Sequence, residues 1–129
     1  MAKPDVVCWI KVINSKTGEA VPDGGWVGPP GNAVVRYVVA NDSNVAAGPL
    51  TVVGSLYKDG IKQGQPNVVP AQQITVKPGT IWMQEVPVSQ VTLFSEYVAK
   101  IVGDIGNFVK EEDEANNLAQ RSFTLIVSF

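Results

Sequence analysis

The chain has 129 residues, of which 45% are hydrophobic and 17% charged, and its net charge is −2. This length is enough to close a hydrophobic core without disulfides or a structural metal, so we expect one domain over residues 1–129. The ten Lys and Arg residues are scattered along the chain. Nucleic-acid binding, which needs a clustered basic face, is therefore disfavoured.

The only cysteine, Cys8, excludes an internal disulfide. It lies in an apolar run, so we expect a buried, unreactive thiol rather than a reactive one. No apolar stretch approaches the ~18 residues of a membrane span. The first residues do not form a signal peptide. Two interpretations stay open: the protein is made and used inside the cell, or a leader or larger parent chain precedes this sequence.

Short apolar runs, many of them alternating with polar residues, predict about seven strands without an amphipathic helix. The expected strands cover residues 5–13, 33–40, 50–57, 73–76, 81–86, 96–102 and 122–129. In the last strand, Phe123, Leu125 and Val127 should face the core. Short strands separated by turn signals are typical of a β-sandwich.

The connections between these strands carry clear turn signals. Asp59-Gly60 predicts a type I′ hairpin turn, and Lys77-Pro78-Gly79 predicts a type II turn. Tyr97 begins the penultimate strand and suits a tyrosine corner, in which the hydroxyl bonds to nearby backbone.

A long Gly/Pro-rich connection spans about residues 14–32, with Trp26 in its middle. Its composition favours an ordered loop or a short irregular hairpin. Two interpretations of Trp26 stay open. It is either an exposed aromatic side chain available for binding, or a tryptophan folded over the edge of the core.

An acidic, Asn-rich segment precedes the last strand. Its hard oxygen donors are of the type that Ca²⁺ takes, although their spacing is not that of an EF-hand; the candidates are Asp104, Asn107, Glu111, Asp113 and Glu114. We favour a structural role, in which Asp104 and Asn107 cap a turn and Asn116 and Asn117 bond to the backbone. We therefore expect no metal and no cofactor, with calcium as the alternative.

Taken in chain order, the motifs resemble those of a known family. They are Pro4-Asp5-Val6-Val7, Asn41-Asp42-Ser43, Ala47-Gly48, Leu56-Tyr57-Lys58-Asp59-Gly60, Val76-Lys77-Pro78-Gly79 and Glu111-Glu112-Asp113-Glu114-Ala115-Asn116-Asn117. The set resembles the CARDB domain of bacterial and archaeal surface and adhesion-related proteins, over nearly the whole chain. The resemblance implies an all-β, immunoglobulin-like, seven-stranded β-sandwich with Greek-key connections. It also implies an adhesive or structural role.

The residue types present argue against catalysis. The chain has no histidine, which removes the usual general base and excludes a Ser-His-Asp arrangement. One cysteine cannot build a thiolate zinc site. Consecutive carboxylates at residues 111–114 sit on a turn without a pocket. We expect that the protein is not an enzyme.

Binding or assembly is the remaining class of function. We select Trp26, Trp82 and Phe129 as interface candidates, and expect either Trp82 or its neighbour Met83 to be a core residue. The hypothesis is a structural or adhesive module that contacts other protein surfaces, its own copies included. It would act at a cell surface or as a subunit of a virion or filament. The alternative is a carbohydrate- or calcium-binding accessory module, built from Trp26 and the acidic turn.

Overall fold

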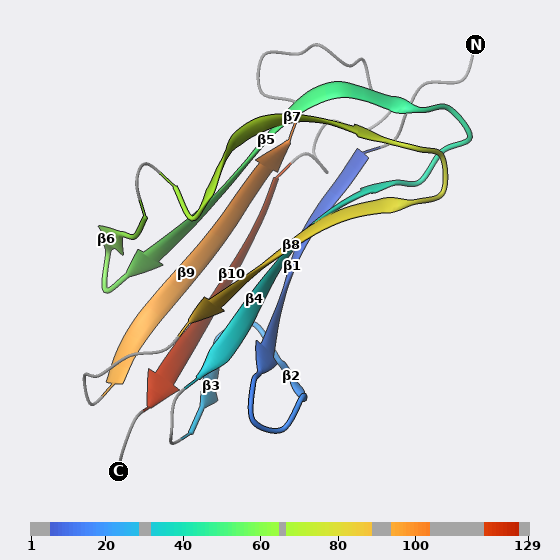
Figure 1. The fold of residues 1–129 in the computed structure, drawn as a ribbon. Helices are drawn as coiled ribbons and strands as arrows, with labels where there is room; N and C mark the ends of the chain where they lie inside the picture. Colours follow the sequence, from blue (N-terminus) through green and yellow to red (C-terminus); the bar gives the residue numbers. More distant parts are fainter. Residues whose placement is uncertain (1–5, 29–31, 65–66, 89–93, 104–117, 127–129) are drawn as a thin grey trace.

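The computed structural model describes residues 6–28, 32–64, 67–88, 94–103 and 118–126, and all of their regular structure is β-strand (Figure 1). Seven strands have eight residues or more: β1 (Val6–Asn14), β4 (Ala33–Asn41), β5 (Ala47–Lys58), β7 (Val69–Val76), β8 (Ile81–Val88), β9 (Phe94–Gly103) and β10 (Leu118–Ile126). Three are shorter: β2 (Ala20–Val21), β3 (Gly25–Val27) and β6 (Ile61–Lys62). The described part of the chain thus has ten strands rather than the expected seven.

The strands form two sheets that pack as a sandwich. One sheet has four strands in the order β2-β1-β4-β8. The other has six: β3-β10-β9-β5-β6, with β7 also paired to β5. The chain passes from β4 to β5 in the second sheet and returns through β7 to β8 beside β4. Such crossings between sheets are the Greek-key connections of immunoglobulin-like sandwiches, so the predicted fold class is confirmed.

Alternation along the long strands builds the core between the sheets. In β1 the inward side chains are buried and include Cys8, as expected for an unreactive thiol. In β9 and β10 the buried positions include Tyr97, Phe123 and Leu125. The rings of Tyr97 and Phe123 stack with centroids 5.2 Å apart. The predicted register of the last strand is therefore confirmed at Phe123 and Leu125, while Val127 lies outside the described residues.

A buried tyrosine ties the two sheets together. The hydroxyl of Tyr37, on β4, donates a hydrogen bond of 2.8 Å to the carbonyl oxygen of Ser55, on β5. Burial raises the pKa of the Tyr37 phenol well above its usual range. The strand opposite leaves room because position 54 is glycine: a Cβ there would lie 3.0 Å from the ring of Tyr37. Tyr37 thus makes a tyrosine–backbone bond of the kind that we expected at Tyr97, and the bond at Tyr97 itself stays a prediction.

The two predicted tight turns are confirmed. Asp59 and Gly60 have φ angles of 50° and 83°, the pair of positive values that a type I′ turn needs. At the second turn, Gly79 has φ of 69° and the N–H of Thr80 donates to the carbonyl of Lys77 at 3.1 Å. This is the geometry of a type II turn.

The remaining differences concern strands with weak hydrophobic patterns. Strand β7 begins at Val69 rather than residue 73. Exposed residues such as Ala71 and Gln73 leave no apolar alternation in the sequence, because this strand is held by backbone pairing with β5. The connection at residues 14–32 contains β2 and β3, each too short to leave a periodic signal. Short edge strands owe their formation to the neighbouring strand, which the local sequence does not encode.

Phe123→Ala and Leu125→Ala each remove most of a fully buried side chain. We expect either change to lower the free energy of unfolding by about 2–5 kcal/mol, because the cavity loses both burial and packing contacts. Thr124→Ala, at an outward position of the same strand, should cost less than about 1 kcal/mol. Urea unfolding measures all three variants, and a Phe123→Ala cost near that of Thr124→Ala would contradict the register.

Candidate functional site

The outer face of the four-stranded sheet carries two rows of apolar side chains. Antiparallel pairing aligns Trp9 with Val38 and Val38 with Met83. The adjacent row aligns Val7, Ala40 and Ile81 in the same way. We call these six residues the apolar face. They belong to β1, β4 and β8, the three long strands of the sheet.

The residues of the apolar face differ in how far their side chains are exposed to solvent. Val38 is only 1% exposed, yet it lies on the outward side of β4 and is not part of the core cluster between the sheets. Its cross-strand neighbours Trp9 and Met83 are 40% and 44% exposed. The two large side chains therefore cover Val38 and present one continuous apolar surface. Contiguous apolar patches of this kind mark interaction sites more often than scattered exposed residues do.

A hollow of about 370 Å³ lies at one end of the apolar face. Its apolar lining comes from four residues of the face: Val7, Trp9, Ala40 and Ile81. Its polar lining comes from the end of β4 and the turn before β8: Asn41, Asp42, Gly79 and Thr80. The site therefore combines apolar walls with a polar rim that carries one carboxylate, Asp42.

Asn41 holds the polar rim in place. Its backbone N–H donates to the carbonyl of Thr80 at 3.1 Å, and its carbonyl accepts from the N–H of Gly79 at 3.0 Å. The buried side-chain amide donates to the carbonyls of Val45 and Val76, at 2.6 and 3.0 Å. Its Oδ1 accepts from the N–H and hydroxyl of Ser43. One side chain thus joins the two turns at this end of the sandwich.

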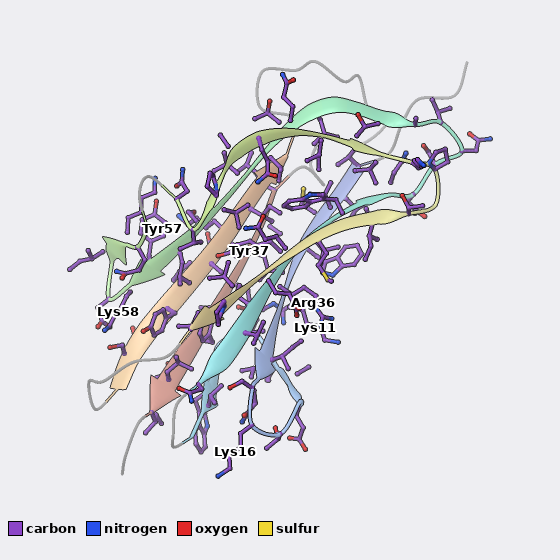
Figure 2. The ribbon with its side chains drawn as sticks, in the orientation of Figure 1. Lys11, Lys16, Arg36, Tyr37, Tyr57 and Lys58 are labelled. Carbon is purple, nitrogen blue, oxygen red and sulfur yellow. The ribbon has the colours of Figure 1, made fainter. Side chains whose placement is uncertain are left out.

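A charged row borders the apolar face on the other side. Pairing aligns Lys11, Arg36 and Glu85 one step beyond the row of Trp9. Arg36 donates from Nε and Nη2 to Oε2 of Glu85, at 3.1 and 3.0 Å. Lys11 and Arg36 lie next to each other in Figure 2. An exposed ion pair adds little stability, so its main effect is to set a polar limit to the apolar face.

The three interface candidates differ in where they lie and how far they are exposed. Trp26 lies on β3 of the six-stranded sheet and is 60% exposed, which favours the exposed interpretation. Trp82 is half-buried and packs against the core, whereas Met83 points outward, as expected for one of this pair. Phe129 lies outside the described residues. Neither tryptophan belongs to the apolar face, and no observation tests the three candidates as contacts.

The calcium candidates also lie outside the described residues; they are Asp104, Asn107, Glu111, Asp113 and Glu114. Among the residues that the structure describes, no group of three or more His, Cys, Asp or Glu is placed to hold a metal ion. The same part of the chain contains no helix long and apolar enough to cross a membrane.

Trp9 is the functional candidate that sequence reasoning missed. The run Val6-Val7-Cys8-Trp9-Ile10 is apolar at every position, so both faces of β1 are apolar. In an antiparallel sheet with one solvated face, alternation is the usual pattern. The lack of alternation was therefore the available signal that the outer face of β1 is apolar as well.

Comparison with known proteins supports the fold alone. No protein-family model and no curated protein matches the chain. The crystal structure of the CARDB domain of the PF1109 protein from Pyrococcus furiosus, in complex with di-metal ions, aligns with a TM-score of 0.63 and 18% identity. The alignment covers 95% of this chain and 89% of that one. The solution NMR structure of the same domain gives a TM-score of 0.65 at 18% identity, covering 99% and 100%. The resemblance to the CARDB domain is thus confirmed at the level of fold.

Asn41→Ala removes the side chain that joins the two turns beside the hollow. We expect it to lower the free energy of unfolding by about 2–4 kcal/mol, because buried backbone carbonyls lose their donors. Asn44→Ala, at an exposed position of the same turn, is the control and should change stability by less than about 0.5 kcal/mol. Urea unfolding measures both. Equal costs would show that Asn41 does not hold the rim.

Proposed function

We propose that the protein is a non-catalytic structural or adhesive module that binds other protein surfaces, copies of itself included, through the apolar face. One observation carries this proposal: Val38 is buried on the outside of the sandwich by Trp9 and Met83. A soluble sheet usually places polar side chains at such positions. The hollow beside the face has a single carboxylate in its lining, Asp42, and no second acid or base. That lining favours binding over acid–base chemistry.

The composition of the apolar face suits a protein contact. Tryptophan is among the residues that most often dominate interface energies, and methionine adapts its shape to a partner. Trp9 and Met83 flank the centre of the face, with the Arg36–Glu85 pair at one border and Asp42 at the other. Charged residues around an apolar centre favour the right partner and orientation more than they raise affinity.

The size of the apolar face limits the strength of a single contact. Two rows across three strands cover an area of roughly 200 Å², given strand spacings near 4.8 Å and rows about 7 Å apart. A standard interface buries about 800 Å² on each partner. One copy of this face therefore gives a weak contact. A contact of high affinity requires that the bordering charged row also takes part in binding, or that several copies bind together.

The setting that we propose is an adhesion system at a cell surface or a repeating extracellular assembly. The CARDB-like fold supports the first version, since the family occurs in surface and adhesion-related proteins. Weak contacts that gain strength by repetition support either version, including a virion coat or filament. The genes beside this one would distinguish a surface-protein operon from a set of virion genes.

Met83→Lys places a charge in the apolar face on edge strand β8. We expect the parent protein to rise above its monomer mass of 13.8 kDa as its concentration increases, and the variant to associate at least ~10-fold more weakly. The reason is that the introduced ammonium loses its hydration in the contact. Light scattering over a concentration series measures the average mass.

The matched control is Ile61→Lys, which places the same charge at an exposed apolar position of the six-stranded sheet. It should associate as the parent does. If both lysine variants weaken association equally, net charge rather than the apolar face is responsible. If the parent remains a monomer throughout, self-association is ruled out, and the proposal then requires a different protein as the partner.

Metal binding is a second candidate, favoured by the di-metal complex of the Pyrococcus domain. At 18% identity this likeness assigns no ligands to the present chain. The acidic run at residues 104–117 offers the right donor type but lies outside the described residues, so its fit to an ion has no geometric support. We retain the structural interpretation of these residues, in which they cap a turn and bond to the backbone.

Calcium addition separates these two interpretations. If the acidic run only caps a turn, millimolar CaCl₂ should shift the melting temperature by less than about 1 °C relative to EDTA. If the run binds calcium, a free Ca²⁺ concentration of ~100 times the Kd would raise the free energy of unfolding by about 2.7 kcal/mol. Thermal unfolding followed by circular dichroism measures the shift. A clear rise that disappears in Glu111→Gln or Asp113→Asn would contradict the structural interpretation and establish a calcium site.

A further inference from the structure

A second hollow, of about 230 Å³, lies on the other sheet, away from the apolar face. Most of its lining comes from residues on the outer side of strands β9 and β10 and from the loop before β3: Glu96, Val98, Ser122, Thr124 and Gly24. Pairing aligns Trp26, Thr124 and Glu96 in one row across three strands. Glu96 and Thr124 line this hollow, whereas the exposed Trp26, on β3, lies next to Thr124, just outside the lining.

The hollow exists because small residues lie between larger ones. Gly24 has no side chain, and a Cβ built there would meet nothing within 4 Å. Ser122 and Thr124 supply short side chains on β10. Larger groups, Trp26 on β3 and Glu96 on β9, flank them in register. The result is a shallow site with a hydroxyl-bearing floor and the carboxylate of Glu96 in its lining, and with the aromatic side chain of Trp26 on the neighbouring strand.

The polar groups of this site are mainly acceptors and hydroxyls. Asp23 lies beside the lining rather than in it: its Oδ1 accepts hydrogen bonds from the N–H and the hydroxyl of the lining residue Ser122, at 2.8 and 3.3 Å. The backbone bond from Ser122 lowers the pKa of Asp23, so this carboxylate is ionised at neutral pH. Glu96 adds a second carboxylate, and Thr124 a second hydroxyl. A ligand that fits them presents several hydrogen-bond donors around a compact ring.

We propose that this hollow binds a neutral pyranose unit of an oligosaccharide, stacked on Trp26 with its hydroxyls bonded to Glu96 and Thr124. A pyranose has a C–H face that packs on an indole and a rim of hydroxyls that donate to carboxylates. The carboxylate of Glu96 in the lining and that of Asp23 beside it disfavour acidic sugars. A cationic side chain would also suit an indole beside carboxylates. The hydroxyl of Thr124 can both donate to and accept from a sugar hydroxyl, whereas a cation uses only its acceptor side, so a sugar uses the polar groups of the site more fully.

This site goes beyond the proposed protein contact and stands independently of it. The apolar face covers the outside of the four-stranded sheet, whereas this hollow lies on the outside of the six-stranded sheet. One molecule could therefore hold a glycan on one side and a protein surface on the other. Failure of either function leaves the other unaffected.

The test is calorimetric titration of the full chain with neutral hexasaccharides of glucose, mannose, xylose and N-acetylglucosamine. We expect the parent to bind at least one of them. Trp26→Ala should weaken binding at least ~10-fold, through loss of the stacking surface. Glu96→Gln should weaken it by a smaller factor, because the amide keeps one acceptor but loses the charge.

The matched control is Ile61→Ala, which removes an exposed apolar side chain from β6 of the same sheet, outside the lining of the hollow, and should leave sugar binding unchanged. Melting temperatures of all variants verify that each one is folded. The proposal is overturned if the parent binds none of these sugars, or if Trp26→Ala and Glu96→Gln both bind as the parent does. Tighter binding of oligolysine than of any sugar, lost in Trp26→Ala, would also overturn it and assign the hollow to a cationic ligand.

Discussion

The pairing of β4 with β1 on one side and β8 on the other is the constraint on which the other features depend. It sets the alternation that turns Tyr37 toward the core and Val38 toward the outer face of the sheet. A slip of one residue would exchange these faces and place Trp9 and Met83 inside the sandwich. Two kinds of bond oppose a slip: the Tyr37 hydroxyl reaches across to Ser55, and Asn41 holds the turns at the end of the strand.

The same register explains why both sides of the four-stranded sheet are apolar. Inward residues of β1 and β4 close the core, and their outward neighbours form the apolar face. An exposed apolar sheet carries an aggregation risk, which proteins usually limit with charge and proline at edges. Here the Arg36–Glu85 pair and Pro87 on edge strand β8 serve that purpose. The face is thereby restricted to a small area, consistent with a specific but weak contact.

Sequence reasoning recovered the sandwich and the two tight turns, because alternation and Asp-Gly or Pro-Gly pairs act locally. It did not recover β2, β3 and β6, whose two or three residues pair only because a long neighbour is present. It selected Trp26 and Trp82 from their neighbourhood in the chain but passed over Trp9, which lies in a fully apolar run. The apolar face depends on three strands far apart in sequence, so only the sheet register brings Trp9, Val38 and Met83 together.

The central claim is that the apolar face becomes buried against another protein surface. Its most direct test uses a variant with Trp26→Phe and Trp82→Phe, in which Trp9 is the only tryptophan. Acrylamide quenching of Trp9 fluorescence is measured as concentration rises, and with any identified partner added. The account predicts that quenching falls together with complex formation, because Trp9 leaves the solvent. Quenching that stays constant while complexes form would place the contact elsewhere and contradict the account.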